Sequence, residues 1–282
     1  MKPVGFDYER PRDLGAALKL LAQSGGNAKI MAGGQSLGPM LNLRLAQPQL
    51  IIDIRRLAEL NEVTHSDASV VLGSCVTHAA IEDGRVPDVT RGLMREVAAH
   101  IAYRAVRNRG TIGGSLCHAD PAADWVSALV LLSAVAVIEG PAGRREVKAE
   151  SFVTGPFSTV LGENEILVAL RIQKFTARAR WGHYKFCRKP GEFAEAIGGV
   201  VVDPDRDVCR AVIGATHSTP HVIENASFLA DRFDSDQAFA AIDAAGLGGD
   251  PYERQVHFTA LKRAATRLQR RVGNSPPQSI VQ

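Results

Sequence analysis

Two short segments, each built around a pair of adjacent glycines, constrain this chain more than any other feature. Residues 32–39 are Ala-Gly-Gly-Gln-Ser-Leu-Gly-Pro, and residues 111–115 are Thr-Ile-Gly-Gly-Ser. Paired glycines let a backbone approach a ligand with its N–H groups turned toward phosphate oxygens. A tight structural turn would explain either segment alone. Two of them suit a diphosphate better than one, because its charge is spread over many oxygens.

The first segment lacks the spacing of a Rossmann dinucleotide site. Its glycines fall at Gly33, Gly34 and Gly38, which does not match the G-x-G-x-x-G fingerprint. Asp120 and Asp124 follow the second pair, and like charge keeps carboxylates away from phosphate. We therefore expect these two side chains to bind a ribose or ribityl hydroxyl, which is a natural partner for a carboxylate.

Hydrophobic periodicity predicts a mixed α and β chain. Helices are predicted at 14–22, 77–82, 93–102, 124–132, 228–233, 237–245 and 252–272. Strands are predicted at 29–31, 50–54, 70–72, 134–139, 166–172, 181–186, 197–202 and 208–215. The second glycine segment, extended to residue 124, is predicted as a loop. A basic stretch at 176–180 is the best candidate for a domain boundary.

Composition excludes several classes of protein. Hydrophobic residues make up 45% and charged residues 22% of the chain, as in globular domains. A net charge of +3 without clustered Lys and Arg argues against binding nucleic acid. Charges occupy the N-terminus where a signal peptide needs apolar residues, and the longest nearly apolar run, 125–138, is too short for a bilayer. We expect a cytoplasmic protein with no membrane span.

Metal sites are not expected in this chain. The four cysteines are widely separated and form no C-x-x-C pair, so any iron–sulfur cluster must come from another chain. They are Cys75, Cys117, Cys187 and Cys209. His217 and His221 have a spacing that suits a metal on a helix, but Pro220 lies between them and predicts a turn.

Taken together, A-G-G-Q-S-L-G-P and R-G-T-I-G-G-S-L-C-H-A-D-P-A-A-D resemble the paired FAD motifs of one family. It comprises the FAD-binding (medium) subunits of molybdenum hydroxylases of the carbon monoxide dehydrogenase and xanthine dehydrogenase type. The similarity extends from residue 6 to about residue 268, and both motifs match without gaps. It implies an α+β, vanillyl-alcohol-oxidase (PCMH) type FAD-binding fold. Two α/β lobes, 1–56 and 57–176, would hold FAD, and 177–282 would form a C-terminal lobe with a three-stranded antiparallel sheet and helices.

The resemblance also implies which residues bind FAD. They are Ala32, Gly33, Gly34, Gln35, Ser36, Leu37, Gly38, Pro39, Ile101, Thr111, Ile112, Gly113, Gly114, Ser115, Asp120, Asp124, Leu167, Tyr184 and Lys185. Gln35 stands where some relatives have His, and Ser115 where many have Asn; both keep hydrogen-bonding groups. Glu192 replaces a commoner Asp. The cysteine-rich insertion that one branch uses for a [4Fe–4S] cluster is missing.

Three polar side chains near the implied site need separate interpretations. A cation at Lys185 would raise the potential of a nearby flavin. Tyr184 is a weaker candidate, because alternation along a strand places it on the opposite face. His118 beside Asp120 could act in acid–base chemistry. Anchoring of the loop is favoured for His118, since electron transfer needs no such base. No catalytic residue is expected in this chain.

The implied function is electron transfer within a complex. A small subunit would relay electrons through two [2Fe–2S] clusters to FAD in this chain, which would pass them to an external acceptor. A large subunit would carry the molybdopterin cofactor and hydroxylate the substrate, in a dimer of heterotrimers. Two alternatives stay open: a self-contained flavin oxidoreductase of the same fold, and a non-catalytic nucleotide-binding module. The chain after residue 180 lacks the acid–base cluster that the first alternative needs.

Overall fold

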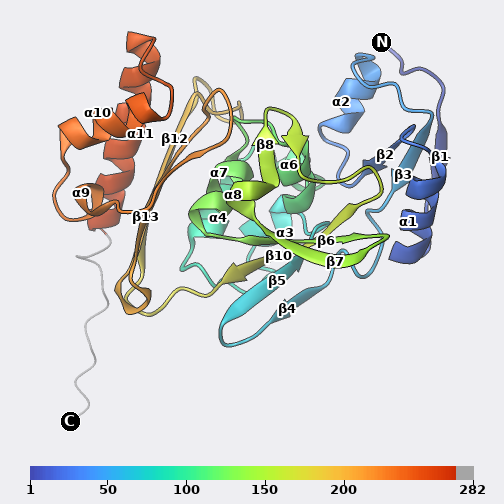
Figure 1. Ribbon diagram of the computed structural model, residues 1–282, viewed down its shortest axis with the longest axis horizontal. Coiled ribbons are helices and arrows are strands. Elements are labelled where there is room, and N and C mark those ends of the chain that lie inside the picture. The colour runs from blue at the N-terminus through green and yellow to red at the C-terminus, as the bar shows by residue number, and fades with distance from the viewer. Residues whose placement is uncertain (271–282) are drawn as a thin grey trace.

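A small parallel sheet, ordered β1-β3-β2, begins the chain and lies at one end of the molecule (Figure 1). The structure is a computed structural model that describes residues 1–270. The first lobe consists of β1 (Asp7–Glu9), α1 (Leu14–Gln23), β2 (Ala28–Met31), α2 (Leu37–Asn42) and β3 (Leu50–Asp53). The parallel register pairs Met31 with Asp53. The segment 32–39 therefore leaves the carboxyl edge of this sheet, where open α/β sheets bind ligands.

An antiparallel sheet of five strands, ordered β4-β5-β10-β6-β7, occupies the centre of the molecule, and helices cover one of its faces (Figure 1). Its strands are β4 (Val63–His65), β5 (Ser69–Gly73), β6 (Val135–Gly140), β7 (Gly143–Lys148) and β10 (Ile166–Gln173). Its helices are α3 (His78–Glu82), α4 (Leu93–Ala99), α5 (Arg104–Arg107), α6 (Ile112–His118), α7 (Asp124–Leu131) and α8 (Ala149–Phe152). A ribbon of β8 (Val153–Gly155) and β9 (Ser158–Thr159) adjoins them. Every residue of α7 is buried, as a helix with apolar residues on all sides requires.

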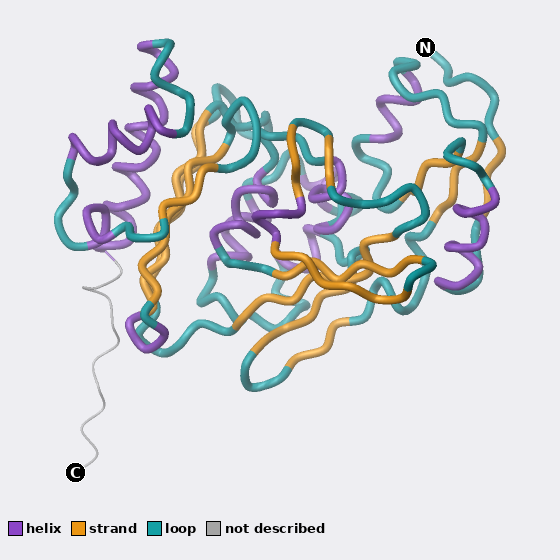
Figure 2. The backbone as a smooth tube through the Cα atoms, viewed as in Figure 1, coloured by secondary structure: helices purple, strands orange, loops and turns teal. Residues whose placement is uncertain are grey.

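A second antiparallel sheet, ordered β11-β12-β13-β14, lies between α7 and the last helix (Figure 2). This C-terminal lobe consists of β11 (Arg180–Phe186), β12 (Ala196–Asp203), the 3-10 turn η1 (Pro204–Arg206), β13 (Val208–Gly214), β14 (His221–Ile223), α9 (Ser227–Ala230), α10 (Ser235–Ala244) and α11 (Pro251–Arg270). All residues of β12 are buried, because helices cover both faces of this sheet. A continuous apolar run is typical of such a strand.

Glycines allow the two helices to approach the C-terminal sheet closely. A Cβ on Gly198 would lie 2.7 Å from the Ala260 carbonyl oxygen of α11, and one on Gly199 would lie 2.6 Å from Leu131 Cδ2 of α7. Neighbouring residues of β12 thus face opposite helices, as strand alternation requires. The close packing fixes β11, which carries Lys185, against the central lobe.

The α+β architecture is confirmed, with two corrections. The C-terminal sheet has four strands, because the short, half-buried β14 joins the three that were expected. Three residues are too few to show an alternating pattern. The second glycine segment is not a loop: Thr111 accepts a hydrogen bond from Gly114 N and starts α6 there. Residues 271–272 of the last predicted helix lie outside the described residues.

The expected domain boundaries fall between sheets. The first sheet ends at Asp53 and the second begins at Val63, while β10 ends at Gln173 and β11 begins at Arg180. We keep the divisions 1–56, 57–176 and 177–282 as a proposal. Apolar side chains of the first lobe, including Ile52, pack on Val137, Ile166 and Val168 of the central sheet.

Candidate cofactor-binding site

The two glycine segments lie against each other. A Cβ on Gly33 would overlap the Arg109 carbonyl oxygen and lie 2.8 Å from Gly110 Cα. A Cβ on Gly114 would lie 3.6 Å from that of Ala32. Only glycine fits at position 33, because backbone atoms of Arg109 and Gly110 cannot move aside as a flexible side chain can. The structure therefore brings the two predicted segments together at one place between the first and central lobes.

The first segment has backbone donors to offer. Gly34 adopts a left-handed conformation with φ of 70°, which costs glycine little. Within residues 1–270, the N–H groups of Gly34, Gln35, Ser36 and Leu37 donate to no acceptor. Consecutive N–H groups around a left-handed residue form a concave anion-binding surface. This segment can therefore hold a phosphate group in the manner that the sequence predicts.

Four of the five backbone N–H groups of the second segment are already engaged. Ile112 N and Gly113 N each donate over 3.0 Å, to the carbonyl oxygens of Val76 and Ser74 respectively. Gly114 N donates to Thr111 Oγ1, and Ser115 N to the Thr111 carbonyl oxygen, each over 3.0 Å. The expectation of two backbone surfaces is therefore wrong for this segment. Among the described residues, its donors without an acceptor are Thr111 N and the hydroxyl groups of Thr111 and Ser115.

A buried ion pair joins the central lobe to the C-terminal lobe. Lys185 Nζ lies 2.8 Å from Asp124 Oδ2, and each side chain is 5% exposed. Lys185 also donates to the His100 carbonyl oxygen over 3.2 Å. Burial raises the pKa of Asp124 against the opposing charge of Lys185. Asp124 Oδ1 is buried without a hydrogen-bond partner among the described residues, and such an acceptor needs a donor from elsewhere.

Three other predicted residues, Ile101, Leu167 and Asp120, lie in different environments. Ile101 is half-buried in the turn after α4, where Arg107 Nη1 donates over 3.0 Å to its carbonyl oxygen. Leu167 is 3% exposed and sits at a register shift of β10. Asp120 Oδ1 accepts from Ala122 N over 2.9 Å and so stabilises its own turn. The turns at Ile101 and at Asp120 are each held by local hydrogen bonds, so neither needs a ligand to keep its shape.

Tyr184 lies on the other face of β11. Its hydroxyl accepts a hydrogen bond from Arg263, and the guanidinium groups of Arg263 and Arg267 stand 4.8 and 5.1 Å from its ring centroid. Both arginines belong to α11. The structure thus packs Tyr184 against the C-terminal helix and does not bring it to the glycine segments.

Sequence reasoning missed a buried histidine behind the second segment. His78 Nδ1 accepts from Trp125 Nε1 over 3.0 Å, and His78 N donates to the Gly110 carbonyl oxygen over 2.9 Å. Burial, with the charge of Arg107, lowers the pKa of His78 to about 4. No local pattern marks this residue in the sequence, because its partners are distant along the chain.

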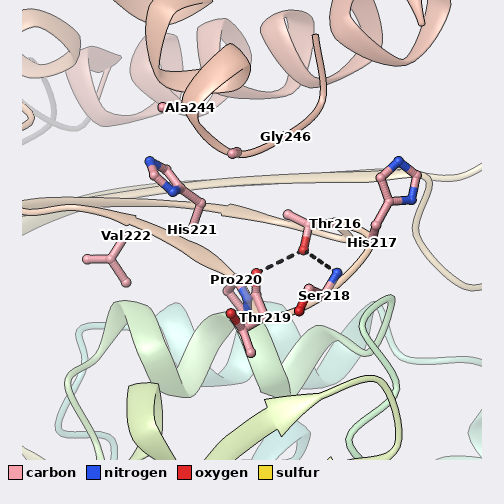
Figure 3. A pocket seen from close by; sticks show the side chains of 10 residues that line it. Thr216, His217, Ser218, Thr219, Pro220, His221, Val222, Ala244 and Gly246 are labelled. Carbon is pink, nitrogen blue, oxygen red and sulfur yellow. Dashed lines mark hydrogen bonds between the residues drawn. The ribbon is translucent and has the colours of Figure 1, made fainter. Parts of the chain in front are cut away.

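The histidines with metal-like spacing line a different cavity. It has a volume of about 400 Å³ and lies in the C-terminal lobe between the turn after β13 and the end of α10 (Figure 3). Figure 3 shows the rings of His217 and His221 apart, on either side of Thr216. His217 Nε2 pairs with Glu253 Oε2 over 3.0 Å. No group of three or more His, Cys, Asp or Glu that could hold a metal ion occurs in residues 1–270.

Comparison with known proteins decides the family. Residues 4–173 match the model of the FAD binding domain in molybdopterin dehydrogenase. The chain belongs to this family.

Relatives of this flavin-binding family extend the match to nearly the whole chain. The carbon monoxide dehydrogenase medium chain of Hydrogenophaga pseudoflava is 36% identical over 258 residues, which cover 90% of both chains. The 6-hydroxypseudooxynicotine dehydrogenase complex subunit alpha of Paenarthrobacter nicotinovorans is 34% identical over 272 residues, covering 94% of this chain and 91% of its own. The resemblance inferred from the glycine motifs is confirmed, and the chain is an FAD-binding oxidoreductase subunit of the molybdenum hydroxylase family.

A solved structure shows the same fold. Carbon monoxide dehydrogenase from Hydrogenophaga pseudoflava, in a form lacking the Mo-pyranopterin moiety of the molybdenum cofactor, matches with a TM-score of 0.87 at 35% identity. The match covers 96% of this chain and 99% of that one. The arrangement of lobes is therefore that of the family's flavin-binding subunits.

The residues present in this flavin-binding subunit fit FAD. The free N–H groups at 34–37 suit phosphate oxygens, and the unpartnered Asp124 Oδ1 suits a hydroxyl of the ribityl chain or ribose. Lys185 supplies a buried positive charge next to Asp124. Among the described residues, no helix combines the length and apolar character that crossing a bilayer requires.

Proposed function

We propose that this chain is the electron-transfer subunit of a molybdenum-containing hydroxylase. It would hold FAD between its first and central lobes, accept electrons from [2Fe–2S] clusters of a small partner subunit, and deliver them to an external acceptor. The large partner would carry the molybdopterin cofactor. The chemistry that bound FAD supplies is the conversion between one-electron and two-electron transfer.

One observation carries the cofactor part of this proposal. The four free N–H groups at 34–37 follow Gly33, which packs closely on Arg109 and Gly110 at the start of the second motif. A site with free backbone donors suits a cofactor that contains phosphate groups. Support for partner subunits comes from the names of the relatives, a medium chain and a subunit alpha of a complex. A dimer of heterotrimers is part of the same proposal.

Each part of the site would have a defined task. The amides of 34–37 would bind the diphosphate, with the hydroxyls of Thr111 and Ser115 donating from the other side. Asp124 Oδ1 would accept from a ribityl hydroxyl. Lys185 would place its charge near the ring system and favour the added negative charge of reduction, which raises the potential. We leave Tyr184 out, because Arg263 engages its hydroxyl on the far face of β11.

The first test is identification of the bound cofactor. We expect the purified chain to be yellow and to release FAD on acid treatment, as measured by absorbance and mass spectrometry. Iron–sulfur absorbance should appear only in material purified with its native partners. Flavin-dependent turnover of an organic donor by this chain alone would instead support a self-contained oxidoreductase. A bound nucleotide without redox activity would support the nucleotide-binding module.

Gly34→Asp should abolish FAD binding. Its carboxylate would stand among the amides that hold the diphosphate, and like charges about 4 Å apart repel by about 4 kcal/mol at a protein surface. The measurement is FAD affinity by fluorescence titration. Gly25→Asp is the matched control, because Gly25 also has a left-handed φ, of 56°, and a Cβ there would meet nothing within 4 Å. Equal FAD affinity in both variants would place the diphosphate elsewhere.

A further inference from the structure

The turn formed by Arg109 and Gly110 packs closely against two neighbours. A Cβ on Gly33 would lie 2.8 Å from Gly110 Cα. A Cβ on Gly110 would lie 2.7 Å from His78 Nε2 and 2.8 Å from His78 Cδ2. His78, the turn and Gly33 therefore stand in series. The contacts that hold the imidazole therefore also influence the position of the first glycine segment relative to the second.

The His78 ring is held firmly on its far side. The ring is 4% exposed, and its Nδ1 accepts the N–H of the fully buried Trp125 over 3.0 Å. An indole nitrogen can only donate, so Nδ1 carries no proton and Nε2 does. Burial lowers the pKa of His78 to about 4, which keeps the ring neutral at physiological pH.

The backbone around His78 belongs to the same unit as the second segment. His78 N donates to the Gly110 carbonyl oxygen over 2.9 Å, and Thr77 forms an antiparallel bridge with Thr111. Ile112 N donates to the Val76 carbonyl oxygen over 3.0 Å. The bond to Val76 and the bridge to Thr77 fix the start of α6, whereas the bond from His78 N ties the turn to the backbone of His78 itself. A displacement of His78 would therefore act on the turn more than on the start of α6. The distance between the two glycine segments would change.

We propose that His78 is a positioning residue for the cofactor: its neutral ring, held by Trp125, fixes the distance between the two glycine segments. This inference rests on the proposed function, in which these segments bind the diphosphate of FAD. Without the ring, the turn can retreat from Gly33. The amides at 34–37 then no longer converge with the hydroxyls of Thr111 and Ser115.

Three variants test the hydrogen bond and the volume of the ring separately. His78→Leu keeps much of the side-chain volume but removes the acceptor, and Trp125→Phe removes the donor. His78→Asn can place its Oδ1 near the position of Nδ1 and accept from Trp125. The probes are FAD and ADP, because ADP carries the diphosphate without the flavin. Affinity is measured by calorimetry on the full chain.

We expect His78→Leu and Trp125→Phe to weaken both FAD and ADP by about tenfold, which corresponds to about 1.4 kcal/mol. His78→Asn should lose less, about threefold, because it restores the acceptor for Trp125 but lacks the ring atoms that face Gly110. The control is His257→Leu. His257 is also buried, at 1% exposure, and its ring lies within hydrogen-bond distance of the Ala215 and Glu253 carbonyl oxygens in the C-terminal lobe. This control should lower thermal stability without changing affinity for FAD.

Several outcomes would overturn the inference: wild-type affinity in His78→Leu, equal losses in His78→Asn and His78→Leu, or an equal loss in His257→Leu. Should His78→Leu fail to fold, Trp125→Phe decides, since unchanged affinity there contradicts the role of the hydrogen bond. A wild-type chain that binds neither FAD nor ADP would refute the proposed function. A wild-type chain that binds both, with insensitive variants, would refute only the role of His78.

Discussion

Lys185 and Tyr184 are neighbours in sequence with opposite surroundings. Lys185 contacts Asp124 in the central lobe, whereas Tyr184 contacts Arg263 of α11. Alternation along β11 separates them, and the sequence predicted this separation. The buried pair of Lys185 and Asp124 is stable only while both charges are present, because a lone buried charge has lost its hydration without compensation.

Lys185→Met should destabilise the protein at neutral pH by about 3–5 kcal/mol, since it leaves the Asp124 carboxylate without its cation. Burial already raises the pKa of Asp124 above its ordinary 3.8, and the variant raises it further. The folded state then binds a proton more readily than the unfolded state. Stability therefore falls as pH rises from about 3.8 through the raised pKa, and the loss is largest at neutral pH. Urea unfolding at pH 5 and pH 7 measures this effect.

The double variant Lys185→Met with Asp124→Asn removes both charges and should recover much of the lost stability. A loss that is independent of pH, or a double variant as unstable as the single one, would show that the carboxylate is not the source of the cost.

At the level of elements, sequence periodicity predicted the long strands and helices and missed those whose form depends on distant contacts. Strand β7 has five exposed residues and one half-buried residue, and therefore lacks alternation. Helix α6 was predicted as a loop because Gly113 and Gly114 are poor helix formers. Gly113 is needed there because its Cβ would lie 2.5 Å from Ser74 Cβ, a contact with another element.

Dependence on residues that are distant in sequence also explains which part of the candidate site could be predicted. The sequence predicted the two glycine segments, because the residues of each segment are consecutive in the chain. It could not show that the Ile112 and Gly113 amides are engaged, because their acceptors, Val76 and Ser74, follow the end of β5, far away in the sequence. The pairing of His78 with Trp125 is equally distant in sequence.

Thr111→Val tests whether the start of α6 serves both folding and binding. The variant removes the hydroxyl that accepts from Gly114 N, at a typical cost of about 1 kcal/mol. It should lower the melting temperature and also weaken FAD binding, whereas Thr111→Ser should preserve both properties.

Asp234→Ala is the matched control for the cap, because Asp234 accepts from Asp236 N and Gln237 N at the start of α10. We expect it to lower the melting temperature without affecting FAD affinity. Comparable affinity losses in Thr111→Val and Asp234→Ala would indicate that general destabilisation, not the Thr111 hydroxyl, governs binding.

At the level of the whole molecule, the C-terminal sheet is the layer that joins α7 to α11. A Cβ on Gly182 would overlap the Ala264 carbonyl oxygen, and one on Gly214 would overlap Ser127 Oγ. Arg210 crosses the same interface, where it contacts Glu150 and donates to Ser133 Oγ over 2.9 Å. Close packing on both faces makes the sheet intolerant of added volume.

Gly182→Ala should lower the free energy of unfolding by about 1–3 kcal/mol, because the added methyl group separates α11 from β11. Chemical denaturation with urea gives this quantity. Gly155→Ala is the control, since a Cβ on Gly155 would meet nothing within 4 Å. Similar stabilities of the two variants would contradict the packing argument.

The origin of Lys185 in the last lobe and of Asp124 in the central one has a consequence for biosynthesis. A ribosome completes α7 well before it completes β11, so the nascent Asp124 carboxylate waits for its cation until the C-terminal sheet has docked. If FAD is held where we propose, the residues that bind its diphosphate are made before β11, and Lys185 completes the site only after the C-terminal sheet has formed. A chain that ends before β11 would then retain the groups proposed for the diphosphate and would lack the cation proposed for the ring system.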